Sequence, residues 1–132
     1  MFDHLADLVR ARVPGLIAVY AFGSRLGGNP LPESDYDLAL LAARPLEPLD
    51  RWYLQEELAS VARTNVDLVD LRRASTVMRV EVLRNCELLF EDPAERSTRE
   101  LFEALALADY ARLNEERRGV LSDIQARGSV HG

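Results

Sequence analysis

Two aspartates separated by one residue are the part of this sequence best suited to chemistry. Asp35 and Asp37 flank Tyr36 at the start of an apolar segment typical of a β-strand. Residues i and i+2 of a strand point to the same face, with Cα atoms about 6.6 Å apart. Two carboxylates this close repel each other unless a cation lies between them, and carboxylates are good ligands for Mg²⁺ and Mn²⁺. The pair therefore predicts a divalent metal site.

A glycine–serine pair upstream of the aspartates is suited to binding phosphate. Gly23 and Ser24 follow an apolar run, and ten residues separate Ser24 from Asp35. Glycine lets the backbone approach a phosphate closely, while the serine hydroxyl and the following backbone N–H groups can donate hydrogen bonds to its oxygens. Arg25 adds a guanidinium with several donors. These residues predict a phosphate-binding turn beside the metal site.

A third carboxylate is expected from the segment Val66–Leu71, which contains Asp67 and Asp70. Because side chains alternate along a strand, these two aspartates cannot share a face. We favour Asp67 for the site, since Asp70 lies at the strand exit, where capping roles are common; Asp70 remains the alternative. Each motif alone is weak evidence. Together they place charge on buried strands, where an unpaired carboxylate costs several kcal/mol, and this indicates a function.

The elements that must position these residues alternate between strand and helix. The predicted strands are Leu16–Phe22, Asp35–Leu41, Val66–Leu71 and Glu87–Glu91, and the predicted helices begin at Phe2, at Leu49–Asp50, after an N-cap at Ser75, and at Pro93. The glycines and prolines between Arg25 and Ser34 predict a structured loop. This order is typical of an α/β (α+β) protein, with a small mixed sheet of about three to four strands flanked by helices.

The last predicted helix extends from Pro93 to about Arg127, with Gly119 as a place where it could break. Its apolar residues form two rows, one of Leu101, Leu105 and Ala108 and another of Phe102, Ala106, Tyr110 and Leu113. A helix packed on its own sheet and a helix that docks a partner both explain such a pattern. At about 1.5 Å per residue the helix would be about 50 Å long, so part of it should protrude.

Length and composition limit the classes of protein that fit. The chain has 132 residues, 48% of them hydrophobic, and we expect one domain with a core at about 1–92 and a helical region at about 93–127. All 16 basic residues are arginines, against 22 acidic residues and a net charge of −6. Lysine chemistry is thereby excluded, and direct nucleic-acid binding is not expected. One cysteine, two histidines and no signal-peptide or membrane-span pattern predict a cytoplasmic protein.

The combined motif resembles a known family signature. Gly23-Ser24, ten residues, and then Asp35-Tyr36-Asp37 look like the signature of the DNA polymerase β-like nucleotidyltransferase superfamily. The short length, the Val66–Leu71 strand and the segment Arg84–Glu91 are most similar to the MNT antitoxins, minimal nucleotidyltransferases encoded beside HEPN-domain toxins.

The resemblance implies roles for the candidate residues. Gly23 and Ser24, with Arg25 beside them, would hold the phosphates of ATP. Asp35 and Asp37 would bind two Mg²⁺ ions, or Mn²⁺ in their place, and Asp67 would complete the site and help to activate the nucleophile. The implied reaction is in-line attack of a hydroxyl on the α-phosphate of ATP, with release of pyrophosphate.

The resemblance also implies a partner. Some antitoxins of this type add AMP to a tyrosine of their HEPN partner and thereby silence an RNA-cutting toxin. Two alternatives remain open at this point: an antitoxin that neutralises its toxin by binding alone, and nucleotidyl transfer to a small molecule. The second is less favoured, because the aminoglycoside-modifying relatives resemble longer chains with an added acceptor-binding domain.

Overall fold

The computed structural model describes residues 1–26 and 35–127, with side chains as far as Gly119. Its helices are α1 (Phe2–Arg12), α2 (Pro48–Ala62), α3 (Thr76–Arg84) and α4 (Arg96–Arg127), its strands are β1 (Leu16–Phe22), β2 (Tyr36–Ala42), β3 (Val66–Asp70) and β4 (Glu87–Glu91), and its short 3₁₀ turns are η1 (Ser24–Leu26) and η2 (Pro93–Glu95). The predicted strands and helices are therefore confirmed, with small shifts at their ends. The structured loop predicted up to Ser34 lies mostly outside the described residues.

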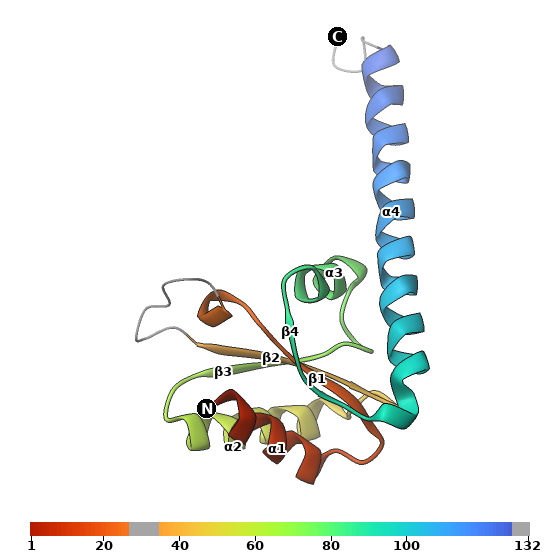
Figure 1. Cartoon of the computed structure of the whole chain (residues 1–132). Coiled ribbons are helices and arrows are strands. Elements are labelled where there is room, and N and C mark those ends of the chain that lie inside the picture. The colour runs from red at the N-terminus through yellow and green to blue at the C-terminus, as the bar shows by residue number, and fades with distance from the viewer. Residues whose placement is uncertain (27–34, 128–132) are drawn as a thin grey trace.

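The four strands form one mixed sheet in the order β3-β2-β1-β4. Strand β1 is antiparallel to both β2 and β4, whereas β2 and β3 are parallel. Helices α1 and α2 lie against one face of the sheet, and α3 and the first part of α4 lie on the other side (Figure 1). The expected fold class, a small mixed sheet flanked by helices with a long C-terminal helix, is confirmed.

Strand β2 contributes to both faces of the sheet. Leu38 and Leu40 are fully buried in the core beneath α1 and α2, while Ala39 and Leu41 are fully buried in the core beneath α3. Because side chains alternate along the strand, Asp37 points to the face that α3 covers. The sheet thus separates a closed, apolar face from the face that carries the candidate site.

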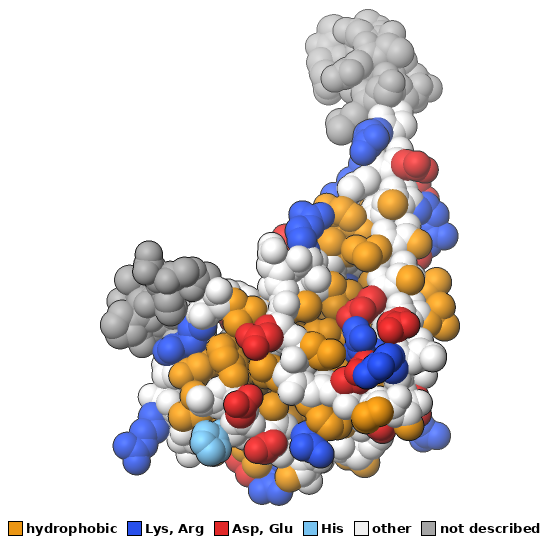
Figure 2. Space-filling model, viewed as in Figure 1, with side chains coloured by type: hydrophobic (Ala, Val, Ile, Leu, Met, Phe, Trp, Pro, Cys, Tyr) orange, Lys and Arg blue, Asp and Glu red, His pale blue; other side chains and the backbone are white. Residues whose placement is uncertain are grey.

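Helix α4 is continuous through its 32 residues, so the break considered near Gly119 does not occur. Its inner side packs on the domain, where Ala106 is 2% exposed. On its outer side, Leu101 and Leu105 are 59% and 55% exposed, and Figure 2 shows apolar side chains along this lower part of the helix. One row therefore packs on the sheet side and the other is left uncovered. Among the described helices, none is both long and apolar enough to cross a membrane.

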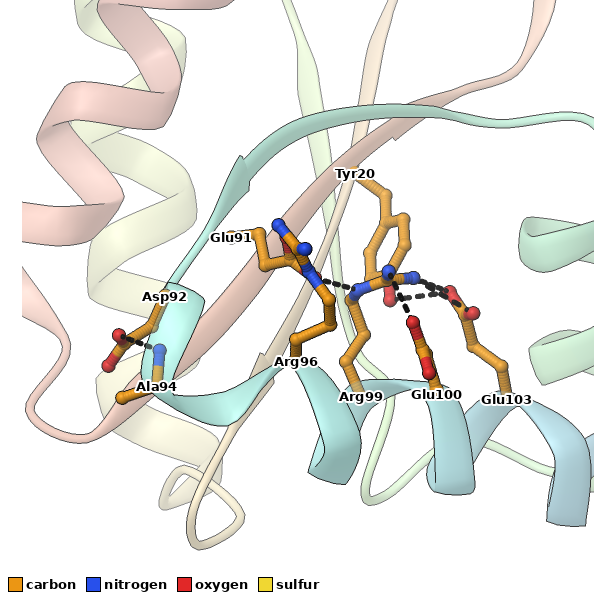
Figure 3. Close-up of polar contacts among 8 residues, drawn as sticks. All are labelled: Tyr20, Glu91, Asp92, Ala94, Arg96, Arg99, Glu100 and Glu103. Carbon is orange, nitrogen blue, oxygen red and sulfur yellow. Dashed lines mark hydrogen bonds and ion pairs between the residues drawn. The ribbon is translucent and has the colours of Figure 1, made fainter.

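A polar cluster fixes the start of α4 to the sheet (Figure 3). Arg99 donates to Glu91 of β4 at 2.7 Å and to Glu103, one helical turn further, at 2.9 Å. The hydroxyl of Tyr20, from β1, donates to Glu103 at 2.9 Å. Burial and this contact raise the pKa of Tyr20, whereas hydrogen bonds from Arg96 and Arg99 lower the pKa of Glu91. The direction of α4 is thus set by charged as well as apolar contacts.

Candidate active site

Gly23 forms a turn directly against the carboxylate of Asp37. Its φ of +85° lies in the left-handed region that favours glycine, and the backbone N–H of Leu26 donates to its carbonyl at 3.2 Å. A Cβ at this position would overlap Oδ2 of Asp37. Glycine is therefore required here both by the backbone conformation and by the closeness of the aspartate.

The strand register places the second aspartate beside Asp37. Asp37 pairs with Phe22 across the β1–β2 ladder and with Asp67 across the β2–β3 ladder. Residues paired in this way on neighbouring strands project from the same face of the sheet. Asp35 lies two residues before Asp37, immediately before β2. The structure therefore brings Gly23, Asp37 and Asp67 together, with Asp35 next to them in the chain.

The negative charges of Asp35 and Asp67 disfavour ionisation of the Asp37 carboxyl between them. Burial of Asp37, followed by the negative charges of Asp67 and Asp35, raises the pKa of the Asp37 carboxyl. A bound cation would relieve that repulsion, and hard carboxylate oxygens are the ligands that Mg²⁺ prefers. As the side chains lie, no three acidic, histidine or cysteine residues within the described part of the chain already converge around one metal position. The donor chemistry of these carboxylates fits a divalent cation.

Asp70 has a different role from Asp67. It is 3% exposed, and its carboxylate accepts hydrogen bonds from the backbone N–H groups of Leu46 at 2.7 Å and Arg72 at 3.0 Å. Side chains alternate along a strand, and Asp70 lies three residues after Asp67. Asp70 therefore points to the opposite face of the sheet, which α1 and α2 cover. Asp70 thus holds the connector after β2 and the turn after β3, away from the carboxylate cluster.

The structure does not bring Arg25 to the carboxylates. Its guanidinium lies 3.9 Å from the ring centroid of Tyr36, and that ring contacts Phe2 of α1 at a centroid distance of 5.0 Å. Tyr36 therefore points to the opposite face from its neighbour Asp37. Ser24, the first residue of η1, is exposed. The phosphate-binding roles expected for Ser24 and Arg25 remain proposals.

A cavity beside Gly23 was not expected from the sequence. It has a volume of about 580 Å³ and is lined by Phe22, Gly23, Leu26, Met78, Glu81 and Asn85. Met78, Glu81 and Asn85 come from α3 and its C-cap. They are three and four residues apart, which places them on one side of a helix. That spacing was visible in the sequence, but nothing in it indicated that this side of α3 faces the Gly23 turn.

The fold and the carboxylate cluster are those expected of a nucleotidyltransferase, and the family comparison gives the same class. The model of the family described as "Polymerase beta, Nucleotidyltransferase" matches residues 6–95, and the chain belongs to this family. Over 124 residues it is 38% identical to the protein adenylyltransferase MntA of Shewanella oneidensis, a match that covers 94% of this chain and 87% of that protein. The resemblance inferred from the sequence is confirmed.

Solved structures give the same result. A crystal structure of a toxin–antitoxin with AMP-PNP has a TM-score of 0.82 and 35% identity, covering 95% of this chain and 99% of its own. A structure of the tri-AMPylated HEPN toxin of Shewanella oneidensis in complex with MNT antitoxin has a TM-score of 0.76 and 35% identity, covering 93% and 94%. These matches extend along the chain beyond the residues that the family model covers.

Proposed function

We propose that this chain is an antitoxin that transfers AMP from ATP to a hydroxyl group of a HEPN toxin and thereby neutralises it. The observation that carries the proposal is the register of Asp37 with Asp67 beside the Gly23 turn. The similarity to a protein adenylyltransferase, and to an antitoxin bound to an AMPylated HEPN toxin, supports protein as the acceptor.

The residues have distinct roles in the proposed reaction. The backbone at Gly23 and the hydroxyl of Ser24 bind the phosphates, and Arg25 joins them by leaving the ring of Tyr36. The acceptor oxygen attacks the α-phosphorus, a new P–O bond forms, and the bond to the β-phosphate bridging oxygen breaks to release pyrophosphate. Asp67 is assigned to draw the proton from the acceptor hydroxyl, because it lies on the edge strand of the sheet, exposed to an incoming partner.

A metal requirement forms part of the proposal. Asp35, Asp37 and Asp67 would hold Mg²⁺, with two ions by analogy with the family and Mn²⁺ as a substitute. When bound, the metal supplies positive charge that offsets the negative charge on the phosphates. The raised pKa of Asp37, caused by burial and by the charges of its two neighbours, supports a cation at this position.

The test is label transfer to a HEPN toxin protein. The purified chain is incubated with that protein, Mg²⁺ and ATP labelled at the α-phosphate, and the partner is then separated and counted. We expect label on the partner with the native chain, and at least a 100-fold lower rate with the Asp35→Asn, Asp37→Asn double variant. Asp7→Asn is a matched control, because the Asp7 side chain is 72% exposed on α1, across the sheet from the site.

Two outcomes would contradict the proposal. Suppressed toxicity with no label on the partner would show that neutralisation works by binding alone. Undiminished transfer by the double variant would show that the carboxylates have been assigned wrongly. A third arm replaces the partner with small hydroxyl-bearing acceptors, and label there but not on the partner would favour the small-molecule alternative.

A further inference from the structure

The outer edge of strand β3 turns one main-chain N–H and one C=O away from the rest of the sheet at Leu68. Strand β3 has only β2 as a neighbour. The carbonyl of Asn65, at the start of β3, accepts from the N–H of Tyr36 at 3.1 Å. The N–H of Leu71, at its end, donates to the carbonyl of Leu40 at 3.0 Å. Because successive residues of a strand form their bonds on alternate sides, Leu68 points both groups outward.

Two polar side chains of α2 bond to both of these groups. The N–H of Leu68 donates to Oε1 of Gln55 at 3.0 Å, and Nη1 of Arg51 donates to the carbonyl of Leu68 at 3.1 Å. The same Nη1 also donates to Oε1 of Gln55 at 3.0 Å, so the two side chains hold each other in place. Leu68 is 2% exposed, while Arg51 and Gln55 are half-buried. We call Arg51, Gln55 and Leu68 together the Leu68 clamp.

The Leu68 clamp lies next to a carboxylate that the proposed reaction uses. Asp67 directly precedes Leu68, pairs with Asp37 on β2 and has an exposed side chain. Without the clamp, hydrogen bonds would hold this part of β3 from the β2 side only. A group that takes a proton must lie within hydrogen-bond distance of it, and a small displacement lowers the rate steeply. The clamp is therefore placed where it can fix the position of Asp67.

We infer that Gln55 and Arg51 are positioning residues for Asp67, which they hold beside Asp37 by fixing the main chain of β3 at Leu68. This inference rests on the proposed function, since it takes Asp67 as the group that draws the proton from the acceptor hydroxyl. Both side chains come from α2, across the sheet from the carboxylates. They therefore act through the main chain and not by contact with ATP.

A simpler explanation of the same hydrogen bonds is that they close an edge strand against pairing with another chain. Edge closure alone predicts no effect on the rate of transfer beyond a general loss of stability. Positioning predicts a lower kcat with little change in the KM for ATP, because the phosphates are assigned to the Gly23 turn and not to β3. The two explanations are thus separated by kinetics.

The experiment measures transfer of labelled AMP to a HEPN toxin by the full chain at saturating Mg²⁺. Gln55→Met removes the hydrogen-bond acceptor and keeps the length of the side chain. We expect kcat to fall about tenfold and the KM for ATP to change by less than about twofold. Gln55→Glu should keep kcat within about threefold of the native value, since a carboxylate accepts both hydrogen bonds.

Arg73→Met is the matched control. Nε of Arg73 also donates to a main-chain carbonyl, that of Leu46 at 2.6 Å, but Arg73 lies beyond the end of β3. This variant should leave kcat unchanged. Equal losses of kcat in Arg73→Met and Gln55→Met would show a general effect on stability and overturn the inference. An unchanged kcat in Gln55→Met, or a Gln55→Glu variant as slow as Gln55→Met, would overturn it as well.

Hydrogen exchange of the Leu68 amide, followed by NMR, tests the clamp without a partner. The native chain should protect this amide, and in Gln55→Met it should exchange at least about tenfold faster. The amide of Val69, which the alternation turns towards β2, should stay protected in both. Rapid exchange at Leu68 in the native chain would overturn the inference, even if Gln55→Met did not fold. A protected Leu68 in a native chain that transfers no AMP would instead contradict the proposed function.

Discussion

Asp37 is held in surroundings that disfavour its own charge. Burial and the charges of Asp67 and Asp35 raise its pKa, so the folded state binds the proton more tightly than the unfolded state does. At pH values above the folded-state pKa, the ionised carboxylate therefore destabilises the fold. Residues that lower stability in this way are typical of functional sites, where a ligand supplies the missing charge.

The first prediction follows from the destabilising effect of the Asp37 charge. Asp37→Asn removes the charge and keeps the shape, so the melting temperature at neutral pH without metal should equal or exceed that of the native chain. Label transfer to the partner should nevertheless fall at least 100-fold. Differential scanning fluorimetry and the transfer assay give the two readouts. A variant that loses stability and keeps transfer would contradict the role given to Asp37.

The second prediction concerns Gly23, which has both a positive φ and a carboxylate oxygen where its Cβ would lie. Gly23→Ala should cost about 1–2 kcal/mol of unfolding free energy, the usual penalty for a left-handed residue with a Cβ, and should displace Asp37. AMP-PNP binding should weaken at least tenfold. Urea unfolding and calorimetry measure the two effects.

Gly119 provides a matched control for the same change of side chain. A Cβ at this glycine would meet nothing within 4 Å, and it lies inside α4. Gly119→Ala should stabilise the helix by up to about 1 kcal/mol and leave nucleotide binding unchanged. If Gly23→Ala behaved in the same way as Gly119→Ala, the turn would not be the phosphate-binding element.

At the scale of elements, the contact between α4 and β4 depends on charge. Hydrogen bonds from Arg96 and Arg99 lower the pKa of Glu91 from an ordinary value of 4.5. A lowered carboxyl pKa adds stability that is present above that ordinary value and is lost as the pH falls through the folded-state value. The anchoring of α4 to the sheet should therefore weaken below about pH 4.5.

The third prediction tests that linkage. Glu91→Gln should lower the melting temperature at pH 7 and reduce its fall between pH 7 and about pH 3, because the variant has no carboxylate to protonate at this position. Melting curves across that range provide the measurement, with Glu56→Gln on α2 as the control. Parallel pH profiles for the native chain and Glu91→Gln would contradict a stabilising role for the ion pairs.

The fourth prediction concerns the uncovered side of α4. Leu101 and Leu105 are more than half exposed, and an exposed apolar row of this kind is typical of a protein interface. If the HEPN partner docks there, Leu101→Arg with Leu105→Arg should weaken its binding at least tenfold without changing the circular dichroism spectrum. Leu49→Arg is the control, because Leu49 is 61% exposed on α2, across the sheet. Unchanged affinity, or equal loss in the control, would contradict the assignment.

At the scale of the whole molecule, the two faces of the sheet have different tasks. The α1 and α2 face is closed by apolar packing, whereas the other face carries the carboxylates, the cavity under α3 and the base of α4. Helix α4 then continues beyond the sheet (Figure 1). The proposed nucleotide site and the uncovered side of α4 therefore both lie on this one chain, where a partner could contact both.

Most of this architecture could be predicted from local patterns. Strand β1 is a short apolar run with turn-forming residues at both ends. Its predicted bounds, Leu16–Phe22, are those observed. Side-chain alternation showed that Asp67 and Asp70 could not share a face, and the position of Asp70 at the strand exit favoured Asp67; the structure places Asp67 beside Asp37 and Asp70 among backbone amides. The strand bounds and faces could be predicted because residue periodicity and turn-forming residues are local properties of the chain.

The features that local patterns could not predict depend on contacts between segments far apart in the sequence. The strand order, with β4 beside β1, follows from packing that no single segment encodes. The stacking of Arg25 on Tyr36 needed the position of the turn relative to β2. The cavity required α3 to cross the sheet next to Gly23. Pattern reasoning also left both interpretations of α4 open; the structure packs one side of the helix on the domain and leaves the other side uncovered.

Transfer of AMP from ATP to a HEPN toxin changes the intact mass of that toxin. The toxin is incubated with this chain, Mg²⁺ and ATP, and its mass is compared before and after. We expect a mass increase of one or more whole AMP groups, which is absent when Asp35→Asn and Asp37→Asn are combined. An unmodified toxin that is nevertheless neutralised in the complex would contradict AMP transfer as the mechanism.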